Sequence, residues 1–272
     1  MNAGTFDWGP LVSGGPLFIG ILNLTPDSFS DGGRFQAPEA ALAQAEALVA
    51  QGCRMLDLGA ESTRPGAAPV TPEEEWRRLE APLALLRRHL PNVPLSLDTR
   101  HAPVAARGLQ AGVAVLNDVT GFGDPALLDL ARTSRCGLIA MRSRRQGDAL
   151  VMPPYTGAGE TTADRALAEL AEVRDRMLDA GIAASRILLD PGFGFGTTYG
   201  EDQALWRALG RWPEHLQWPV DRVCLGISRK RFLAHRAGQP DLPPGQRDGL
   251  TAEAHREAQA LGIRVFRTHA VS

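Results

Sequence analysis

The stretch PLSLDTRHAPVAARGLQAGVAVLND, residues 94–118, holds two short apolar runs, 94–97 and 113–116, with a helix-like segment between them. Short runs rich in Val, Ile and Leu that alternate with longer helical segments are typical of parallel strands joined by helical crossovers. Asp98 directly follows the first run and Asn117 the second. The stretch therefore predicts a strand–helix–strand unit with polar side chains at the carboxyl ends of its strands.

The same alternation continues in both directions along the chain. Eight strands are predicted, at 17–22, 54–58, 94–97, 113–116, 137–141, 186–189, 222–226 and 264–268. Helices are predicted at 38–51, 72–89, 101–110, 124–133, 160–180, 202–210 and 246–261, with a short turn near 229–236. Eight strand–helix units of about 34 residues fill the 272 residues. Because no linker divides the chain, we predict one domain, residues 1–272, folded as a single (β/α)8 TIM barrel.

The predicted barrel has one irregular feature, at its end. The sequence stops at Ser272, four residues after the last predicted strand. We therefore expect the final C-terminal helix of the barrel to be missing, which would leave an apolar flank that is exposed or contacts a partner.

Composition and charge exclude several classes of protein. Hydrophobic residues make up 44% and charged residues 22%, which is the usual composition of a globular domain with a full core. A net charge of −2 gives no field that could hold a nucleic acid or an anionic membrane. The sequence contains neither an apolar run that could span a membrane nor a secretory signal pattern, so we expect a cytoplasmic protein. Cys53, Cys136 and Cys224 are expected to pack in the core.

Polar residues follow most of the predicted strands. In a β/α barrel these positions converge on one mouth, where the chemistry takes place. Taken singly, Asp98, Asn117 or Asp190 is more often a cap or a turn former than a ligand contact. Together they predict an acceptor-rich pocket floor, suited to a flat heterocycle with adjacent N–H and NH₂ donors such as a 2-aminopyrimidinone.

The end of the last predicted strand adds cationic groups to this mouth. Arg267 and His269 are two residues apart and can face the same way in an extended segment. Barrel closure brings the last strand beside the first, and so brings Asn23 close to them. Arginine and histidine suit phosphate oxygens, and an amide oxygen suits Mg²⁺. Thr63 and Arg64, in the loop after the second predicted strand, are a further candidate contact for an anion. The alternatives are that His269 is a frayed terminal residue and that Arg64 is merely solvated.

Lys230 is singled out by composition. It is the only lysine among 29 basic residues, so every other one is an arginine. Lysine is a compact point charge whereas arginine is a planar, permanently charged fork. Lys230 is therefore a candidate site residue.

Several common motifs are excluded. The glycines at 192, 194 and 196 resemble a dinucleotide fingerprint, but Thr197 stands where its last glycine is required. No sequence pattern for a zinc hydrolase, a P-loop or a serine nucleophile elbow occurs.

Four long motifs carry a resemblance to a known family. They are GILNLTPDSFSDGG at 20–33, DLGAESTRPG at 57–66, DPGFGFG at 190–196 and GISRK at 226–230. On these motifs the chain, from about residue 17 to its end, resembles the dihydropteroate synthases of folate biosynthesis.

The resemblance implies a transferase that joins 6-hydroxymethyl-7,8-dihydropterin diphosphate to 4-aminobenzoate and releases diphosphate with help from Mg²⁺. By similarity, Lys230 and the acceptors Asp98, Asn117 and Asp190 hold the pterin, beside Met141 and either Phe195 or Phe193. Asn23, Arg267 and His269 would hold the diphosphate and the metal, with Asn23 as the metal ligand. The pocket for 4-aminobenzoate would be closed by Thr63, Arg64, Pro65 and Ser228. A homodimer is also implied.

The chain departs from the family pattern at four positions. Arg142 stands where the family usually has His, Thr197 where it has Lys, Asp202 where Asn is common and Ala270 where Asp usually follows the last His. These departures leave two alternatives to an active synthase, a pterin-binding paralogue with an accessory role and a pterin-dependent methyltransferase. Retention of five residues favours departure of diphosphate, since a methyl donor offers no such leaving group: Asn23, Thr63, Arg64, Arg267 and His269.

Overall fold

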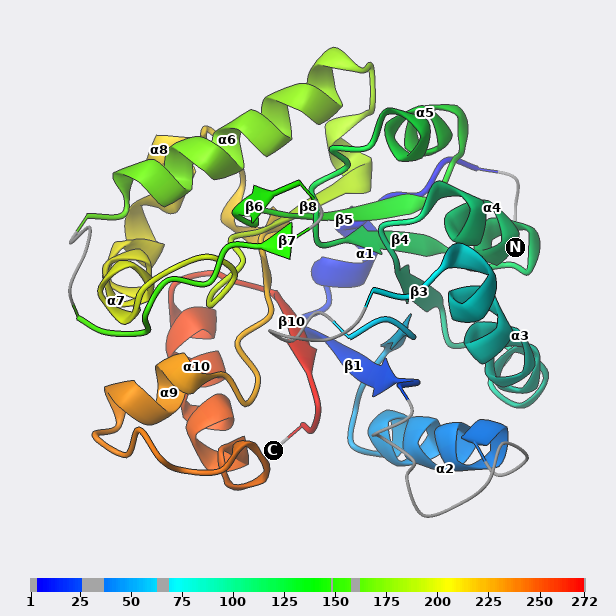
Figure 1. Cartoon of the computed structure of the whole chain (residues 1–272), viewed down its shortest axis with the longest axis horizontal. Coiled ribbons are helices and arrows are strands. Elements are labelled where there is room, and N and C mark those ends of the chain that lie inside the picture. The colour runs from blue at the N-terminus through cyan, green and yellow to red at the C-terminus, as the bar shows by residue number, and fades with distance from the viewer. Residues whose placement is uncertain (1–3, 26–36, 63–68, 148, 158–161, 272) are drawn as a thin grey trace.

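The computed structural model describes residues 4–25, 37–62, 69–147, 149–157 and 162–271. Its centre is a parallel eight-stranded sheet that closes into a barrel (Figure 1). The strands run in the order β8-β5-β4-β3-β2-β1-β10-β9, and a parallel bridge between Leu189 and Val223 joins the two ends. The strands are β1 (Leu17–Asn23), β2 (Met55–Gly59), β3 (Leu95–Asp98), β4 (Val115–Asp118), β5 (Gly137–Met141), β8 (Ile187–Asp190), β9 (Cys224–Leu225) and β10 (Val265–Thr268). The predicted barrel and its eight strands are confirmed.

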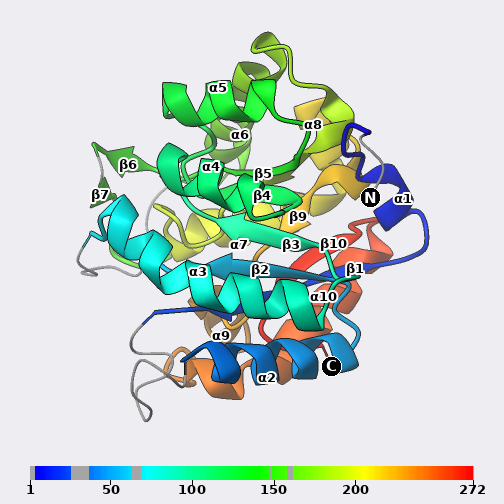
Figure 2. The same cartoon turned by 90° about the vertical axis from the view of Figure 1, so that its right-hand side faces the viewer.

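Helices surround the sheet, and Figure 2 views the flank formed by α2, α3, α4 and α5. The seven predicted helices are present as α2 (Ala37–Ala50), α3 (Pro72–His89), α4 (Ala102–Gln110), α5 (Pro125–Thr133), α6 (Asp164–Asp179), α7 (Tyr199–Ala208) and α10 (Asp248–Ala260). The segment predicted as a short turn near 229–236 contains a helix, α9 (Arg231–Arg236). The sequence did not reveal the short helices α1 (Gly9–Val12) and α8 (Trp212–Leu216), nor the hairpin of β6 (Arg145–Gln146) and β7 (Ala149–Leu150). Within the described residues no helix follows β10.

The inside of the barrel is built by the two-residue alternation of its strands. Leu17, Val115, Ile139, Leu188 and Val265 belong to one buried cluster, which Trp8 of the N-terminal segment joins. Because successive side chains of a strand point to opposite faces, the residue two positions further on points inward again, nearer the carboxyl ends. Apolar packing thus fixes the direction of the polar residues at the mouth.

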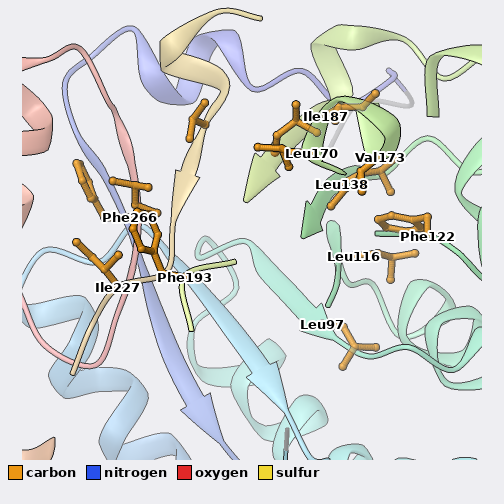
Figure 3. Close-up of a cluster of buried hydrophobic side chains, with 14 of the residues drawn as sticks. Leu97, Leu116, Phe122, Leu138, Leu170, Val173, Ile187, Phe193, Ile227 and Phe266 are labelled. Atoms are coloured by element: carbon orange, nitrogen blue, oxygen red, sulfur yellow. The ribbon is translucent and has the colours of Figure 1, made fainter. Parts of the chain in front are cut away.

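The outward-facing strand residues pack against the helices. Leu97, Leu116 and Leu138 of the sheet lie in one cluster with Phe122 and Leu170 (Figure 3). All three cysteines are buried and free, as expected.

The expected exposed apolar flank is not seen in the part of the chain that the structure describes. Its exposed large hydrophobic residues are Val151, Leu178 and Leu261, and none of them belongs to β1 or β10. Phe18 of β1 and Phe266 of β10 stack with ring centroids 5.6 Å apart, and His255 of α10 lies against both rings.

Candidate active site

A cavity opens at the carboxyl ends of the strands, where the sequence predicts the site. It brings together nine of the predicted site residues, which are Asn23, Asp98, Met141, Asp190, Phe195, Ser228, Lys230, Arg267 and His269. The predicted acceptors and the predicted cationic groups therefore share one space. Thr63, Arg64 and Pro65 lie outside the described residues.

Arg267 is held between two carboxylates on the floor of this cavity. Its Nε donates to Oδ2 of Asp57 at 2.8 Å, and its Nη2 donates to Oδ2 of Asp98 at 2.9 Å. Burial disfavours the charged guanidinium, but Asp57 and Asp98 outweigh this effect and raise the pKa of Arg267. Arg267 is thus a permanent cation whose direction is fixed by two strands.

Asn117 lies beneath the cavity rather than on its wall. Its side chain is almost completely buried, and Nδ2 donates to Oδ2 of Asp57 at 3.0 Å. Asp57 was not among the predicted site residues, although it belongs to one of the family motifs. The alternation from Met55 to Asp57 is the signal that could have identified it, because Met55 belongs to the buried cluster inside the barrel.

Asp98 and Asp190 supply the acceptors of the cavity. Burial raises the pKa of Asp98, and the nearby carboxylate of Asp57 adds to this effect while Arg267 opposes it. Burial also raises the pKa of Asp190, against the influence of Lys230, and its Oδ1 accepts from the backbone N–H of Gly192 at 2.8 Å.

Lys230 lies partly buried beside these acceptors. Its Nζ donates to the carbonyl oxygen of Phe193 and lies 4.4 Å from the centre of the Phe195 ring. Burial lowers the pKa of Lys230 to about 8, although Asp190 and Asp202 favour the charged form. The only lysine of the chain is therefore an amine that titrates near neutrality and faces the cavity.

The two candidate phenylalanines are now distinguished. The ring of Phe195 lines the cavity, whereas the ring of Phe193 is fully buried and packs against Trp206, Trp212 and Phe232. Figure 3 shows Phe193 as part of the hydrophobic cluster. Phe193 therefore contributes its carbonyl group to the site and its ring to the core.

Ser228 orients His269. The hydroxyl oxygen of Ser228 accepts from the backbone N–H of His269 at 3.1 Å and lies 3.0 Å from its Nδ1. His269 directly follows β10 and is held by these contacts, so it is not a frayed terminal residue.

Two of the departures from the family pattern contact each other. Thr197 Oγ1 donates to Oδ1 of Asp202 at 2.7 Å, and the backbone N–H of Gly194 lies 3.0 Å and 3.2 Å from these two oxygens. Tyr155 donates its hydroxyl to the other oxygen of Asp202 at 2.6 Å. The two substitutions thus form a local network, which holds the glycine-rich segment that carries Phe193 and Phe195.

The fold and the cavity define a β/α barrel with acceptors and cationic groups gathered in one site at the carboxyl ends of its strands. In comparisons with known proteins, the family described as pterin binding enzyme matches residues 19–269. The chain is 38% identical to the dihydropteroate synthase of Neisseria meningitidis serogroup C over 94% of this chain and 88% of the relative. It is 36% identical to that of Synechocystis over 98% of this chain and 88% of the relative.

Solved structures agree with these relatives. The Xanthomonas albilineans dihydropteroate synthase with 4-aminobenzoic acid has a TM-score of 0.81 at 36% identity and covers 94% of this chain and 88% of its own. The Anaplasma phagocytophilum enzyme, with bound 6-hydroxymethylpterin-monophosphate, has a TM-score of 0.79 at 34% identity and covers 94% of both chains. The chain belongs to the pterin-binding enzyme family, in its dihydropteroate synthase branch of folate-pathway transferases.

Proposed function

We propose that the chain joins 6-hydroxymethyl-7,8-dihydropterin diphosphate to 4-aminobenzoate, forming 7,8-dihydropteroate and releasing diphosphate. The observation that carries this proposal is the shared cavity, in which Asp190 and Lys230 lie with Arg267 and Asn23. The substrate carries a pterin edge and a diphosphate on one molecule. Partners for the ring and partners for the phosphates must therefore lie within the length of that molecule.

Asp190 and Asp98 are the proposed acceptors for the N–H and NH₂ donors of the pterin, with Asn117 supporting the floor beneath. Lys230 donates to an acceptor on the opposite edge of the ring, because an ammonium has three donors and no acceptor. Met141 and Phe195 contact the apolar faces of the ring. Both line the cavity.

Arg267, His269 and Asn23 are the proposed partners of the diphosphate. Arg267 presents a permanent positive charge, which stabilises the negative charge that develops on the leaving group. His269, oriented by Ser228, adds a second donor.

The residues at this end of the cavity also fit Mg²⁺. The described residues hold no group of three or more His, Cys, Asp or Glu side chains that could bind a metal. Mg²⁺ usually keeps several waters and binds through one or two protein ligands and the substrate phosphates. The partly exposed amide of Asn23 on the cavity wall suits that arrangement as the single protein ligand. When bound, Mg²⁺ would neutralise charge on the diphosphate oxygens.

The bond between the methylene carbon and the diphosphate oxygen breaks first, and its electron pair leaves with the diphosphate. Asp98 and Asp190 favour the positive charge that remains on the dihydropterin. The neutral arylamine then forms the carbon–nitrogen bond. The anilinium so formed is acidic and passes its proton to water, so little acid–base catalysis is required of the protein.

An adjoining cavity of about 400 Å³ shares Phe195 and Lys230 with the first and offers room beside the pterin. We place 4-aminobenzoate near these two residues and Ser228, with Thr63, Arg64 and Pro65 completing its pocket.

We also propose a cytoplasmic homodimer, as the family resemblance implies. Among the described residues no helix has the length and apolar character needed to cross a lipid bilayer. Light scattering on the purified chain tests the dimer.

Diphosphate release tests the activity. We expect release from the pterin diphosphate only when 4-aminobenzoate and Mg²⁺ are both present, with 7,8-dihydropteroate formed in equal amount. A chain that binds the pterin and releases nothing would be an accessory paralogue. Methyl transfer from a methylated pterin would identify the related methyltransferase activity instead.

A further inference from the structure

The segment 191–197 connects the acceptor Asp190 to α7 and carries Phe193 and Phe195. It has no regular secondary structure. Gly192 has a φ angle of +65°, and a Cβ at this position would lie 2.0 Å from the carbonyl oxygen of Arg142. The segment is thus packed directly on the residues that follow β5.

Arg142 holds the first half of this segment. Its side chain is 2% exposed. Nε donates to the carbonyl oxygen of Pro191 at 2.8 Å, and Nη2 donates to that of Gly192 at 3.0 Å. Nη1 donates to Oε2 of Glu169 on α6 at 2.9 Å. One guanidinium therefore ties two backbone carbonyl groups to a helix.

Arg144 holds the second half in the same way. Its Nη1 donates to the carbonyl oxygen of Gly196 at 3.1 Å and to Oε1 of Glu201 at 2.6 Å. Its Nε donates to Oε1 of Glu169 at 2.8 Å. Two arginines and two glutamates thus form a balanced network, which we call the arginine clamp and define as Arg142, Arg144, Glu169 and Glu201.

None of the clamp residues lines either cavity. The segment that they hold presents the carbonyl oxygen of Phe193 and the ring of Phe195 to Lys230. We propose that Arg142 and Arg144 are positioning residues, which fix the segment 191–197 against Lys230 and so set the shape of the pterin site. This inference rests on the proposed function for the identity of the ligand, but its geometry does not depend on turnover.

The chemistry of the side chain explains why arginine is needed at position 142. Its contacts use three separate N–H groups, directed at two carbonyl oxygens and one carboxylate. An imidazole has at most two N–H groups, whereas a guanidinium has five in a rigid fork. An imidazole at this position cannot make this set of contacts, so the clamp depends on the arginine at position 142.

The effect of the arginine clamp on the pterin site can be measured without turnover, as the Kd of the pterin alcohol 6-hydroxymethylpterin. We expect Arg142→Gln and Arg144→Gln each to raise its Kd about tenfold, since each removes charge-assisted hydrogen bonds. Arg165→Gln is the matched control, because Arg165 is 58% exposed and pairs with the same Glu169 at 3.1 Å without touching the segment. Its Kd should stay within about twofold of the wild-type value.

The single lysine allows a second, direct readout. Protein labelled with ¹³C at lysine Cε gives one resonance, that of Lys230. The charged groups that act most strongly on this amine are Asp190, Asp202, Arg267 and Arg142. The contacts of Arg144 are instead with Gly196, Glu169 and Glu201. In Arg144→Gln we therefore expect the pKa of Lys230 to rise from about 8 toward the ordinary lysine value of about 10.4, because the segment relaxes and water reaches the amine.

Folded Arg142→Gln and Arg144→Gln proteins that bind the pterin alcohol like the wild type, with an unchanged lysine titration in the second, would overturn the inference. If Arg144→Gln does not fold, Glu201→Gln serves instead, since the amide keeps an acceptor for Arg144 while the charge is lost. It should raise the Kd about threefold and shift the lysine titration in the same direction, and no change in either would also overturn the inference. A wild-type chain that fails to bind the pterin alcohol would count against the proposed function alone, because the lysine titration still tests the clamp.

Discussion

Arg267 on β10 and Asp57 on β2, two strands that flank β1, meet inside the barrel with Nε of the arginine 2.8 Å from Oδ2 of the carboxylate. The same oxygen accepts from Nδ2 of Asn117 on β4. Asp57 therefore joins the proposed phosphate partner to the floor of the proposed pterin site, although it lines neither cavity.

Replacement of Asp57 by alanine should destabilise the protein strongly. Arg267 would keep only Asp98 as a partner, and removal of one member of a buried ion pair costs about 3–5 kcal/mol. Urea unfolding measures this loss. Asp129→Ala is the control, because Asp129 is 63% exposed and pairs with Arg132 at 2.6 Å on the surface, so its loss should change the free energy of unfolding by less than about 1 kcal/mol. Similar losses in both variants would show that the buried pair adds nothing.

Pterin binding and diphosphate binding should separate in variants of the cavity. We expect Lys230→Ala and Asp190→Ala to abolish turnover through loss of binding of the pterin alcohol, measured by calorimetry. His269→Ala should spare the alcohol and weaken the diphosphate ester about tenfold or more, because it removes a hydrogen-bond donor to phosphate. Equal loss of alcohol binding in all three variants would contradict this division.

Pterin binding should weaken in alkaline solution. The pKa of Lys230 is lowered to about 8, so the free protein loses the ammonium donor as the pH rises through that value. We expect the Kd of the pterin alcohol to rise up to about tenfold per pH unit above this point, and to be constant with respect to this group below it. Lys230→Met should bind weakly and lose this step. An unchanged step in Lys230→Met would assign it to another group.

Gly192→Ala should impair the site through the backbone. An added Cβ would lie 2.0 Å from the carbonyl oxygen of Arg142, which must then move together with the segment 191–197. Gly147→Ala is matched to it, because Gly147 also has a positive φ, of +57°, but has nothing within 4 Å of the added atom. Gly147→Ala should lose only the about 1–2 kcal/mol that an alanine in the left-handed conformation costs. We expect loss of pterin binding in the first variant alone.

The eight strands could be predicted because each is an apolar run between polar or glycine-rich segments. The elements that were missed are short. The hairpin strands have two residues each, and α1 and α8 have four and five, too few to show a periodic pattern. Helix α7 begins at Tyr199 rather than at 202, because Thr198 and Glu201 form a capping box that was available in the sequence.

The part of the candidate site that lies on the strands could be predicted from the two-residue alternation of their side chains. Asp98, Asp190 and Arg267 each lie at an inward position at the end of a strand, so their meeting follows from the barrel itself. The arginine clamp was not predictable. Glu169 lies 27 residues after Arg142, and Glu201 lies 57 residues after Arg144, on two different helices whose packing decides the contact.

The barrel is joined unevenly around its circumference. Five residue pairs connect β1 with β2, whereas one bridge pair, Leu189 with Val223, joins β8 to the segment that enters β9. Local opening requires the least free energy where backbone pairing is sparsest, so amide hydrogens should exchange with deuterium fastest at this seam. Asp190 is the last residue of β8, on one side of this seam, and Lys230 follows β9, on the other. A ligand that contacts both residues would hold the two strands together where only one backbone pair joins them. Its binding should therefore slow hydrogen exchange at the seam.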